Sequence, residues 1–148
     1  MFKKIIFIAI LSVSALFASG VKWAKDYESG VKTAISENKP MLFISSRHTC
    51  KYCVMLDENT LQDPKVIEAL NRDFISVTSY SDENDYIPRD LWRPGTPSIW
   101  FLYPDGTPMY QPIPGYIKSG DFLNALAIVK KEFDKVDAER QAKNRKIK

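Results

Sequence analysis

Arg47-His48-Thr49-Cys50-Lys51-Tyr52-Cys53 is the stretch that decides how this sequence is interpreted. It contains both cysteines and the single histidine of the 148-residue chain. An apolar run at residues 41–46 precedes it, and no glycine or proline follows before Pro64. An apolar strand that leads through Cys-x-x-Cys into a helix is typical of a redox site, because unpaired N–H groups and the helix dipole favour thiolate there. We therefore predict that Cys50 attacks and Cys53 resolves.

Residues 1–18 have the pattern of a secretory signal peptide. Lys3 and Lys4 form the charged region, residues 5–17 the apolar region, and Ala18-Ser19-Gly20 the small residues for cleavage. An uncleaved membrane anchor is the alternative, but the apolar run is short for a membrane span. We therefore expect an exported, periplasmic protein. A disulfide between residues three apart closes almost no loop, so this pair favours redox use over a structural role.

The charge distribution gives no indication of a nucleic-acid partner. The formal net charge is +3, and residues 19–133 carry 13 basic and 15 acidic side chains. A nucleic-acid-binding domain needs a basic face of its own. Residues 134–148 hold six Lys/Arg against three Asp/Glu. We interpret this charged C-terminal tail as a solvated helix end, with contact to anionic lipid or an acidic partner as the alternative.

Hydrophobic periodicity and chain breakers predict one α/β domain over residues 19–133. Helices are expected at 27–38 after the cap Asp26, at about 50–59, from the cap Asp63 onward, and from the cap Ser119 to about 133. Strands are expected at 41–46, 74–80 and 96–103, the last with a hairpin partner at 108–112. Residues 21–25 form a short edge strand or a lead-in, and 81–95 form a polar loop with a short helix near 89–92. This order indicates a sandwich with a mixed central sheet.

Thr96-Pro97 begins the strand that follows the polar loop. A proline there occupies a first or an edge position, and alone it indicates no more than an ordinary trans bond. Together with the Cys-x-x-Cys helix upstream and Asp105-Gly106 downstream, it resembles the thioredoxin fold, in which a cis-proline faces the redox pair. The resemblance implies a three-layer α/β/α sandwich with a mixed central sheet and a cis bond before Pro97.

The resemblance covers residues 23–133 and is closer to one group, the exported thioredoxin-like proteins related to the C-terminal domain of the transmembrane reductant conductor DsbD. The matching motifs are, in order, Lys39-Pro40, Cys50-Lys51-Tyr52-Cys53, Gly95-Thr96-Pro97, Asp105-Gly106 and Gly115-Tyr116. The resemblance implies an enzyme, a thiol–disulfide oxidoreductase that acts on protein thiols and disulfides. It implies that Thr96 and Pro97 hold the substrate beside Cys50, and that a membrane reductant conductor is a partner. We expect a monomer with no cofactor besides the Cys50–Cys53 disulfide.

The sequence departs from the thioredoxin pattern at two positions. Thr49 stands where an aromatic residue usually precedes the first cysteine, and Ile44 stands where a buried acid usually moves the proton of the resolving thiol. Asp57, Glu58 or solvent are the alternatives for that proton. His48 and Lys51 are candidate modulators that lower the pKa of Cys50 by their positive charge, or else they are ordinary exposed residues.

Four functions are compatible with these residues. The resemblance favours a reductase, and disulfide isomerisation is the alternative in the same class, supported by Tyr52 and Thr96. A metal-binding carrier with the ligands His48, Cys50 and Cys53 belongs to a different class, but structural zinc needs four ligands, and we predict no metal site. A redox-inactive peptide-binding module is the fourth.

Overall fold

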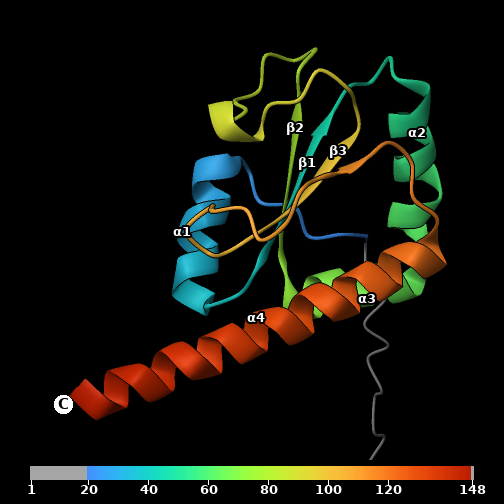
Figure 1. Ribbon diagram of the computed structural model, residues 1–148. Coiled ribbons are helices and arrows are strands. Elements are labelled where there is room, and N and C mark those ends of the chain that lie inside the picture. Colours follow the sequence, from blue (N-terminus) through green and yellow to red (C-terminus); the bar gives the residue numbers. More distant parts are fainter. Residues whose placement is uncertain (1–19, 148) are drawn as a thin grey trace, which may run out of the picture.

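The computed structural model describes residues 20–147, so the predicted signal peptide lies outside the described residues. A four-stranded sheet runs through the middle of the domain, with strand order β2-β1-β3-β4, in which β4 (Ile113–Pro114) is an edge strand (Figure 1). β1 (Met41–Ser46) pairs in parallel with β2 (Ile75–Tyr80) and antiparallel with β3 (Ser98–Leu102). The prediction of a mixed central sheet is therefore confirmed.

β1 is the central strand because it can be buried on both faces. All six of its residues are buried, as the continuous apolar run predicts for a strand with neighbours on each side. Leu42 and Ile44 point to one face of the sheet, whereas Met41 and Phe43 belong to a separate cluster on the other face. The strand carries no charged side chain, and its C-terminal end delivers the chain directly to the redox segment.

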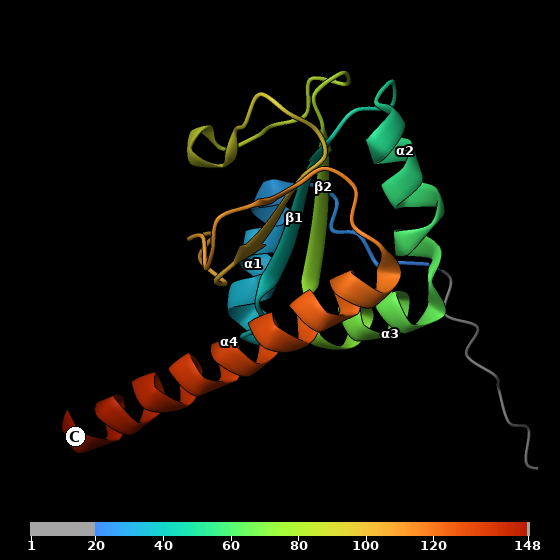
Figure 2. The same cartoon turned by 45° about the vertical axis from the view of Figure 1, so that its right-hand side comes forward.

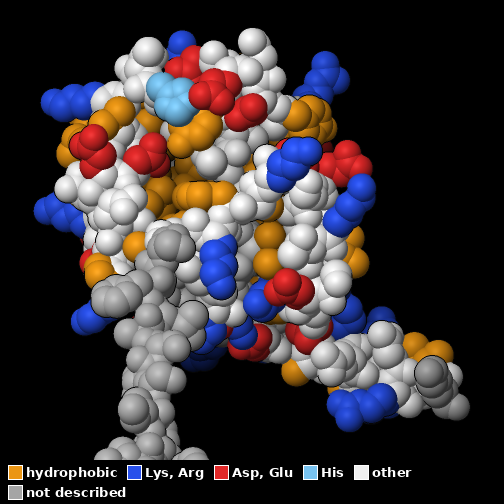
Figure 3. All heavy atoms as spheres, turned by 180° about the vertical axis from the view of Figure 1, so that it is seen from behind, with side chains coloured by type: hydrophobic (Ala, Val, Ile, Leu, Met, Phe, Trp, Pro, Cys, Tyr) orange, Lys and Arg blue, Asp and Glu red, His pale blue; other side chains and the backbone are white. Residues whose placement is uncertain are grey.

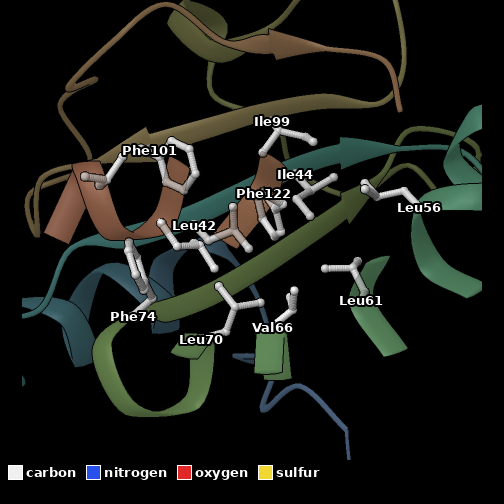
Figure 4. Packing of buried hydrophobic residues seen from close by; sticks show 12 residues of the cluster. Leu42, Ile44, Leu56, Leu61, Val66, Leu70, Phe74, Ile99, Phe101 and Phe122 are labelled. Atoms are coloured by element: carbon white, nitrogen blue, oxygen red, sulfur yellow. The ribbon is translucent and has the colours of Figure 1, made fainter. Parts of the chain in front are cut away.

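Helices cover both faces of this sheet. α1 (Tyr27–Glu37) packs on the face of Met41 and Phe43, with Ala34 fully buried there. α2 (Lys51–Glu58), α3 (Pro64–Asp73) and α4 (Ser119–Ile147) cover the opposite face. Figure 4 shows how Leu56, Leu70 and Phe122 from these three helices converge on β1. The result is the expected three-layer α/β/α sandwich.

Side-chain caps fix where two of the predicted helices begin. The Asp26 carboxylate accepts the N–H of Ser29 at 2.8 Å and caps α1. The Asp63 carboxylate accepts the N–H of Lys65 at 2.8 Å and caps α3, whose first residue is Pro64. Both caps agree with the sequence-based expectation. The short helix η2 (Arg89–Leu91) also forms where the sequence predicts one, and η1 (Thr60–Gln62) connects α2 to α3.

The prediction of a hairpin strand at residues 108–112 is wrong. The partner of β3 is β4 (Ile113–Pro114), and residue 108 forms only an isolated bridge with Leu102. The physical reason is that Pro108 and Pro112 lack the N–H group that a ladder requires. For residues 21–25, where the sequence allowed an edge strand or a lead-in, the structure has a lead-in with one isolated bridge, between Trp23 and Ser76.

α4 continues well beyond the apolar stripe that anchors it. Phe122, Leu126, Val129 and Phe133 are buried, and from Glu139 onward the described side chains of the helix are exposed. Figures 1 and 2 show the C-terminal part of α4 projecting away from the domain. The charged residues 134–147 are thus a continuation of the last helix. Across residues 20–147, no helix combines the length and apolar character that a membrane crossing requires.

Candidate functional site: a dithiol at the start of α2

Cys50 lies at the junction between the loop after β1 and the first turn of α2. It is the N-cap of the helix, with an extended backbone conformation (φ −95°, ψ 118°). Its thiol therefore lies beside the N–H groups that have no partner within the helix. Arg47, His48 and Thr49 lead to it and are all exposed, whereas Cys53, one turn into the helix, is fully buried.

The Cys50 sulfur is held between its own helix and a second loop. The N–H of Cys53 donates to Cys50 Sγ at 3.3 Å. Cys50 Sγ also lies 3.3 Å from the carbonyl oxygen of Thr96, to which the protonated thiol donates. The Thr96–Pro97 bond is cis, which is the geometry implied by the resemblance to thioredoxins. The structure thus brings together Cys50, Cys53, Thr96 and Pro97 from two distant parts of the chain.

β4 holds the Thr96–Pro97 loop in place opposite the thiol. The N–H of Gly115 donates to the carbonyl of Pro97 at 2.8 Å, and Ser98 pairs with Pro114 in the ladder. Gly115 has a φ of +77°, which a residue with a side chain rarely adopts. The short strand, which the sequence-based prediction placed at residues 108–112, therefore supports the loop that lies beside Cys50.

The two thiols have opposite pKa shifts. Burial acts to raise the pKa of Cys50, but hydrogen bonds from the Cys53 thiol, the Thr96 hydroxyl and the N–H groups of Cys53 and Tyr52 outweigh it and lower the pKa of Cys50 below that of an ordinary thiol. Burial raises the pKa of Cys53, and its hydrogen bond to Cys50 raises it further. Thiolate therefore accumulates on the more accessible sulfur, which is the arrangement that an attacking and a resolving cysteine require.

The usual buried acid is replaced by apolar packing. Ile44 is 1% exposed and belongs to the same apolar cluster as Leu56 of α2. Ser46 lies two residues further along the same face of β1, and its hydroxyl is buried without an aligned hydrogen bond. The hydroxyl approaches the Cys53 thiol and acts to lower its pKa, against the larger effect of burial. The sequence analysis did not single out Ser46. Its position two residues after Ile44 on a buried strand was the available signal.

Asp57 differs from Glu58, the other acid named as an alternative proton acceptor. Asp57 is half-buried on α2, four residues after Cys53 and hence on the same side of the helix, whereas Glu58 is exposed. Burial raises the pKa of Asp57, and this effect is opposed by the charge of His48 and by a hydrogen bond from Tyr80. The structure therefore gives Asp57 a partly desolvated environment on the redox helix itself.

His48 and Lys51, the two candidate modulators, lie in different surroundings. Lys51 is exposed at the first position of α2. His48 is directed to the loop after β2, where its Nε2 atom lies 2.6 Å from Glu83 Oε1. Figure 3 shows the histidine with carboxylates beside it on the surface. Asp82 and Glu83 are site neighbours that sequence reasoning missed, and the acidic composition of residues 82–85 was the signal for them.

The geometry does not support the metal-carrier alternative. Within residues 20–147, no group of three or more His, Cys, Asp or Glu side chains is arranged to hold a metal ion. The imidazole of His48, one of the three ligands that this alternative names, pairs with Glu83.

Comparison with known proteins supports the same fold. Among curated proteins, anterior gradient protein 3 of Mus musculus is 26% identical over 89 residues, which covers 55% of this chain and 54% of that protein. The chain thus spans about half the length of the curated relatives that it matches.

Solved structures show the fold across most of the domain. A thioredoxin from Thermus thermophilus superposes with a TM-score of 0.62 at 23% identity, covering 74% of this chain and 87% of the other. The reduced C-terminal domain of DsbD from Neisseria meningitidis superposes with a TM-score of 0.54 at 22% identity, covering 68% and 90%.

The model of the family described as "Thioredoxin-like domain" matches residues 27–130, which include α1, the dithiol, the Thr96–Pro97 loop and the first part of α4. The chain therefore belongs to the thioredoxin-like domain family and carries a Cys50–Cys53 pair on that oxidoreductase fold.

Proposed function

We propose that the protein is an exported thiol–disulfide oxidoreductase that reduces disulfides of other proteins in the periplasm. The observation that carries this proposal is the placement of the Cys50 thiol at the start of α2. This thiol has a lowered pKa and lies 3.3 Å from the Thr96 carbonyl oxygen, whereas the Cys53 thiol one turn later is buried. A reactive sulfur beside an exposed loop and a protected sulfur behind it can perform two sequential exchanges.

The reaction transfers two electrons from the dithiol to the substrate. The Cys50 thiolate attacks one sulfur of a substrate disulfide, whose S–S bond breaks, so that a mixed disulfide forms and the first substrate thiolate leaves. Cys53 then loses its proton to the solvent, which also protonates the released substrate thiolate, and attacks Cys50 Sγ. The mixed disulfide breaks, the second substrate thiolate leaves, and the Cys50–Cys53 disulfide forms.

The Thr96–Pro97 loop orients the substrate in this proposal. Its backbone holds the substrate chain beside Cys50, and the 3.3 Å distance between Cys50 Sγ and the Thr96 carbonyl oxygen supports this assignment. A membrane reductant conductor returns the dithiol to its reduced form, and the protein works as a monomer without a further cofactor. These assignments extend the family resemblance to this chain.

Trapping of the mixed disulfide tests the proposal. The reduced Cys53→Ser variant of the full chain is mixed with insulin, and the products are analysed by mass spectrometry under non-reducing conditions. We expect a stable adduct through Cys50, which dithiothreitol releases, because a serine hydroxyl at position 53 cannot resolve it. The Cys50→Ser variant is the control and should form no adduct through residue 50. Absence of an adduct in the Cys53→Ser variant would contradict the proposal.

The direction of electron flow needs a separate measurement. Intact cells are quenched with acid, and free thiols are labelled with a reagent that adds mass. A pair that is mostly reduced supports the reductase function, whereas a mostly oxidised pair points to disulfide donation. Isomerisation is distinguished by whether the protein restores activity to a scrambled disulfide protein without net reduction.

A further inference from the structure

The loop that carries the nucleophile has few supports of its own. Arg47, His48 and Thr49 are exposed, and the turn is closed by the N–H of Cys50 donating to the carbonyl of Arg47 at 3.3 Å. A segment this exposed is held mainly by contacts with neighbouring loops. The structure provides such contacts through His48.

Three different parts of His48 contact the segment of residues 80–85, which we call the acidic loop. The backbone N–H of His48 donates to Asp82 Oδ2 at 2.8 Å. Its Nε2 atom lies 2.6 Å from Glu83 Oε1. Its ring stacks on Tyr80, with centroids 4.0 Å apart and planes inclined by 9°. The side chain and the backbone amide of His48 thus join two segments that are separated by more than thirty residues.

The acidic loop is itself held by the Asp85 carboxylate and by backbone hydrogen bonds, so it offers a stable attachment point. Asp85 accepts the N–H of Tyr80 at 2.8 Å, and the N–H of Glu83 donates to the carbonyl of Tyr80 at 3.0 Å. The N–H of Ser81 donates to the carbonyl of Ser46 at 3.1 Å, which ties the loop to the end of β1. Its acidic side chains therefore serve the local structure, and two of them hold His48.

We propose that His48 is a positioning residue of the redox site, which clamps residues 47–50 to the acidic loop and so keeps the Cys50 sulfur between the Cys53 N–H and the Thr96 carbonyl. This inference rests on the proposed function, in which Cys50 is the nucleophile. It replaces the sequence-based idea that the imidazole charge acts directly on the thiol. His48 and Glu83 are about half exposed, 52% and 57%, so the ion pair is screened and its main contribution is orientation.

The groups that face His48 come from two segments of the chain. They are Tyr80, Asp82 and Glu83 of the acidic loop, and Asp57 of α2, whose carboxyl senses the His48 charge.

Site-resolved alkylation of Cys50 tests the clamp. The reduced full chain is treated with limiting iodoacetamide from about pH 4 to about pH 10, and modification of Cys50 is followed by peptide mass spectrometry, which reports the thiolate fraction. The variants are His48→Ala, Glu83→Ala and Glu83→Gln. Glu28→Ala is the matched control, because it removes an exposed carboxylate from an ion pair with Lys32 on α1.

The sign of the Glu83→Ala effect decides between positioning and simple charge. If Glu83 positions His48, its loss frees the loop, and the thiolate fraction of Cys50 below its midpoint falls about threefold, a rise of about half a pH unit in that midpoint. If Glu83 acts only by charge, loss of a nearby anion favours thiolate and lowers the midpoint. Glu83→Gln retains an acceptor for His48 and should lie between wild type and Glu83→Ala, and the control should not shift.

Hydrogen exchange of the His48 amide gives a second readout. Its N–H is bound to Asp82, so exchange should become faster in Glu83→Ala and stay unchanged in Glu28→Ala. A lowered midpoint, or an unchanged midpoint together with unchanged exchange, overturns the clamp. Alkylation needs no protein substrate, so failure of the clamp is distinguishable from failure of mixed-disulfide trapping, which tests the proposed function.

Discussion

The two ends of the first turn of α2 place the same chemical group in opposite environments. Cys50, at the N-cap, is partly exposed and accepts an N–H, and its pKa is lowered. Cys53, three residues later, is fully buried, and its pKa is raised. The difference arises from position on the helix and from the neighbours, since the residue type is identical. In the proposed reaction, this difference separates the attacking thiol from the resolving thiol.

The largest expected effect comes from removing each sulfur in turn. Cys50→Ser should lower the rate of insulin reduction more than about a hundredfold, because a hydroxyl is not ionised near neutral pH. Cys53→Ser should also stop turnover, but after one attack, with the adduct retained. The rates are compared by insulin precipitation, and the two variants differ in the adduct seen by mass spectrometry. Equal adduct formation by both would remove the distinction between the two cysteines.

An acid placed on β1, next to the buried side of α2, should destabilise the domain and so test whether the surroundings of Cys53 are apolar. Ile44→Asp introduces a carboxyl at a position that is 1% exposed, and we expect the free energy of unfolding to fall by about 3 kcal/mol at neutral pH, because a buried charge without a partner is unfavourable. The control Ile44→Val should lower it by about 1 kcal/mol. Urea denaturation measures both. A wild-type value for Ile44→Asp would contradict the apolar environment assigned to this side of the dithiol.

Substitutions at the two cysteines should change the free energy of unfolding by smaller and unequal amounts. Cys53→Ala removes a fully buried side chain and should lower the free energy of unfolding of the reduced protein by about 1 kcal/mol. Cys50→Ser should change it by less than about 0.5 kcal/mol, because serine is a preferred N-cap residue. Thermal or urea unfolding under reducing conditions compares them. A larger loss in Cys50→Ser would indicate that Cys50 has a structural role.

The smallest effect concerns the hydroxyl beside Cys53. Ser46→Ala removes a buried hydroxyl without an aligned partner, so stability should stay within about 1 kcal/mol of wild type or increase. Because the Ser46 hydroxyl acts to lower the pKa of Cys53, the variant should raise the pKa of Cys53. The measurement is the alkylation of Cys53 against pH in a Cys50→Ser background. A lowered midpoint for Cys53 would contradict this placement of Ser46.

The sequence predicted the fold well because its local signals are consistent with each other. The apolar run at residues 41–46, the caps Asp26 and Asp63, and the stripe of α4 each agree with the observed elements. β4 was misplaced because a strand of two residues at the sheet edge carries almost no periodicity, and because Pro112 before it and Pro114 within it are unusual in a strand.

The site was predictable where one motif contains it and unpredictable where it depends on side-chain direction. The apolar run before the motif and the segment without glycine or proline after it placed Cys50 at the helix start, and the spacing placed Cys53 one turn behind it. No periodicity indicates that the ring of His48 stacks on Tyr80, or that Asp82 and Glu83 hold it, because these contacts join loops of irregular conformation. Likewise, the Ser46 hydroxyl is buried without a hydrogen-bond partner because of tertiary packing, which the local sequence does not reveal.

The most direct test of the central claim is the pH dependence of alkylation at each cysteine of the reduced wild-type protein, resolved by peptide mass spectrometry with limiting reagent. Only thiolate reacts, so a lowered pKa moves the rise in rate to lower pH and a raised pKa moves it to higher pH. We expect Cys50 to react first, with its midpoint below that of an ordinary thiol, and Cys53 to react later and at higher pH. Preferential modification of Cys53, or equal midpoints for the two, would contradict the opposite environments of the two thiols.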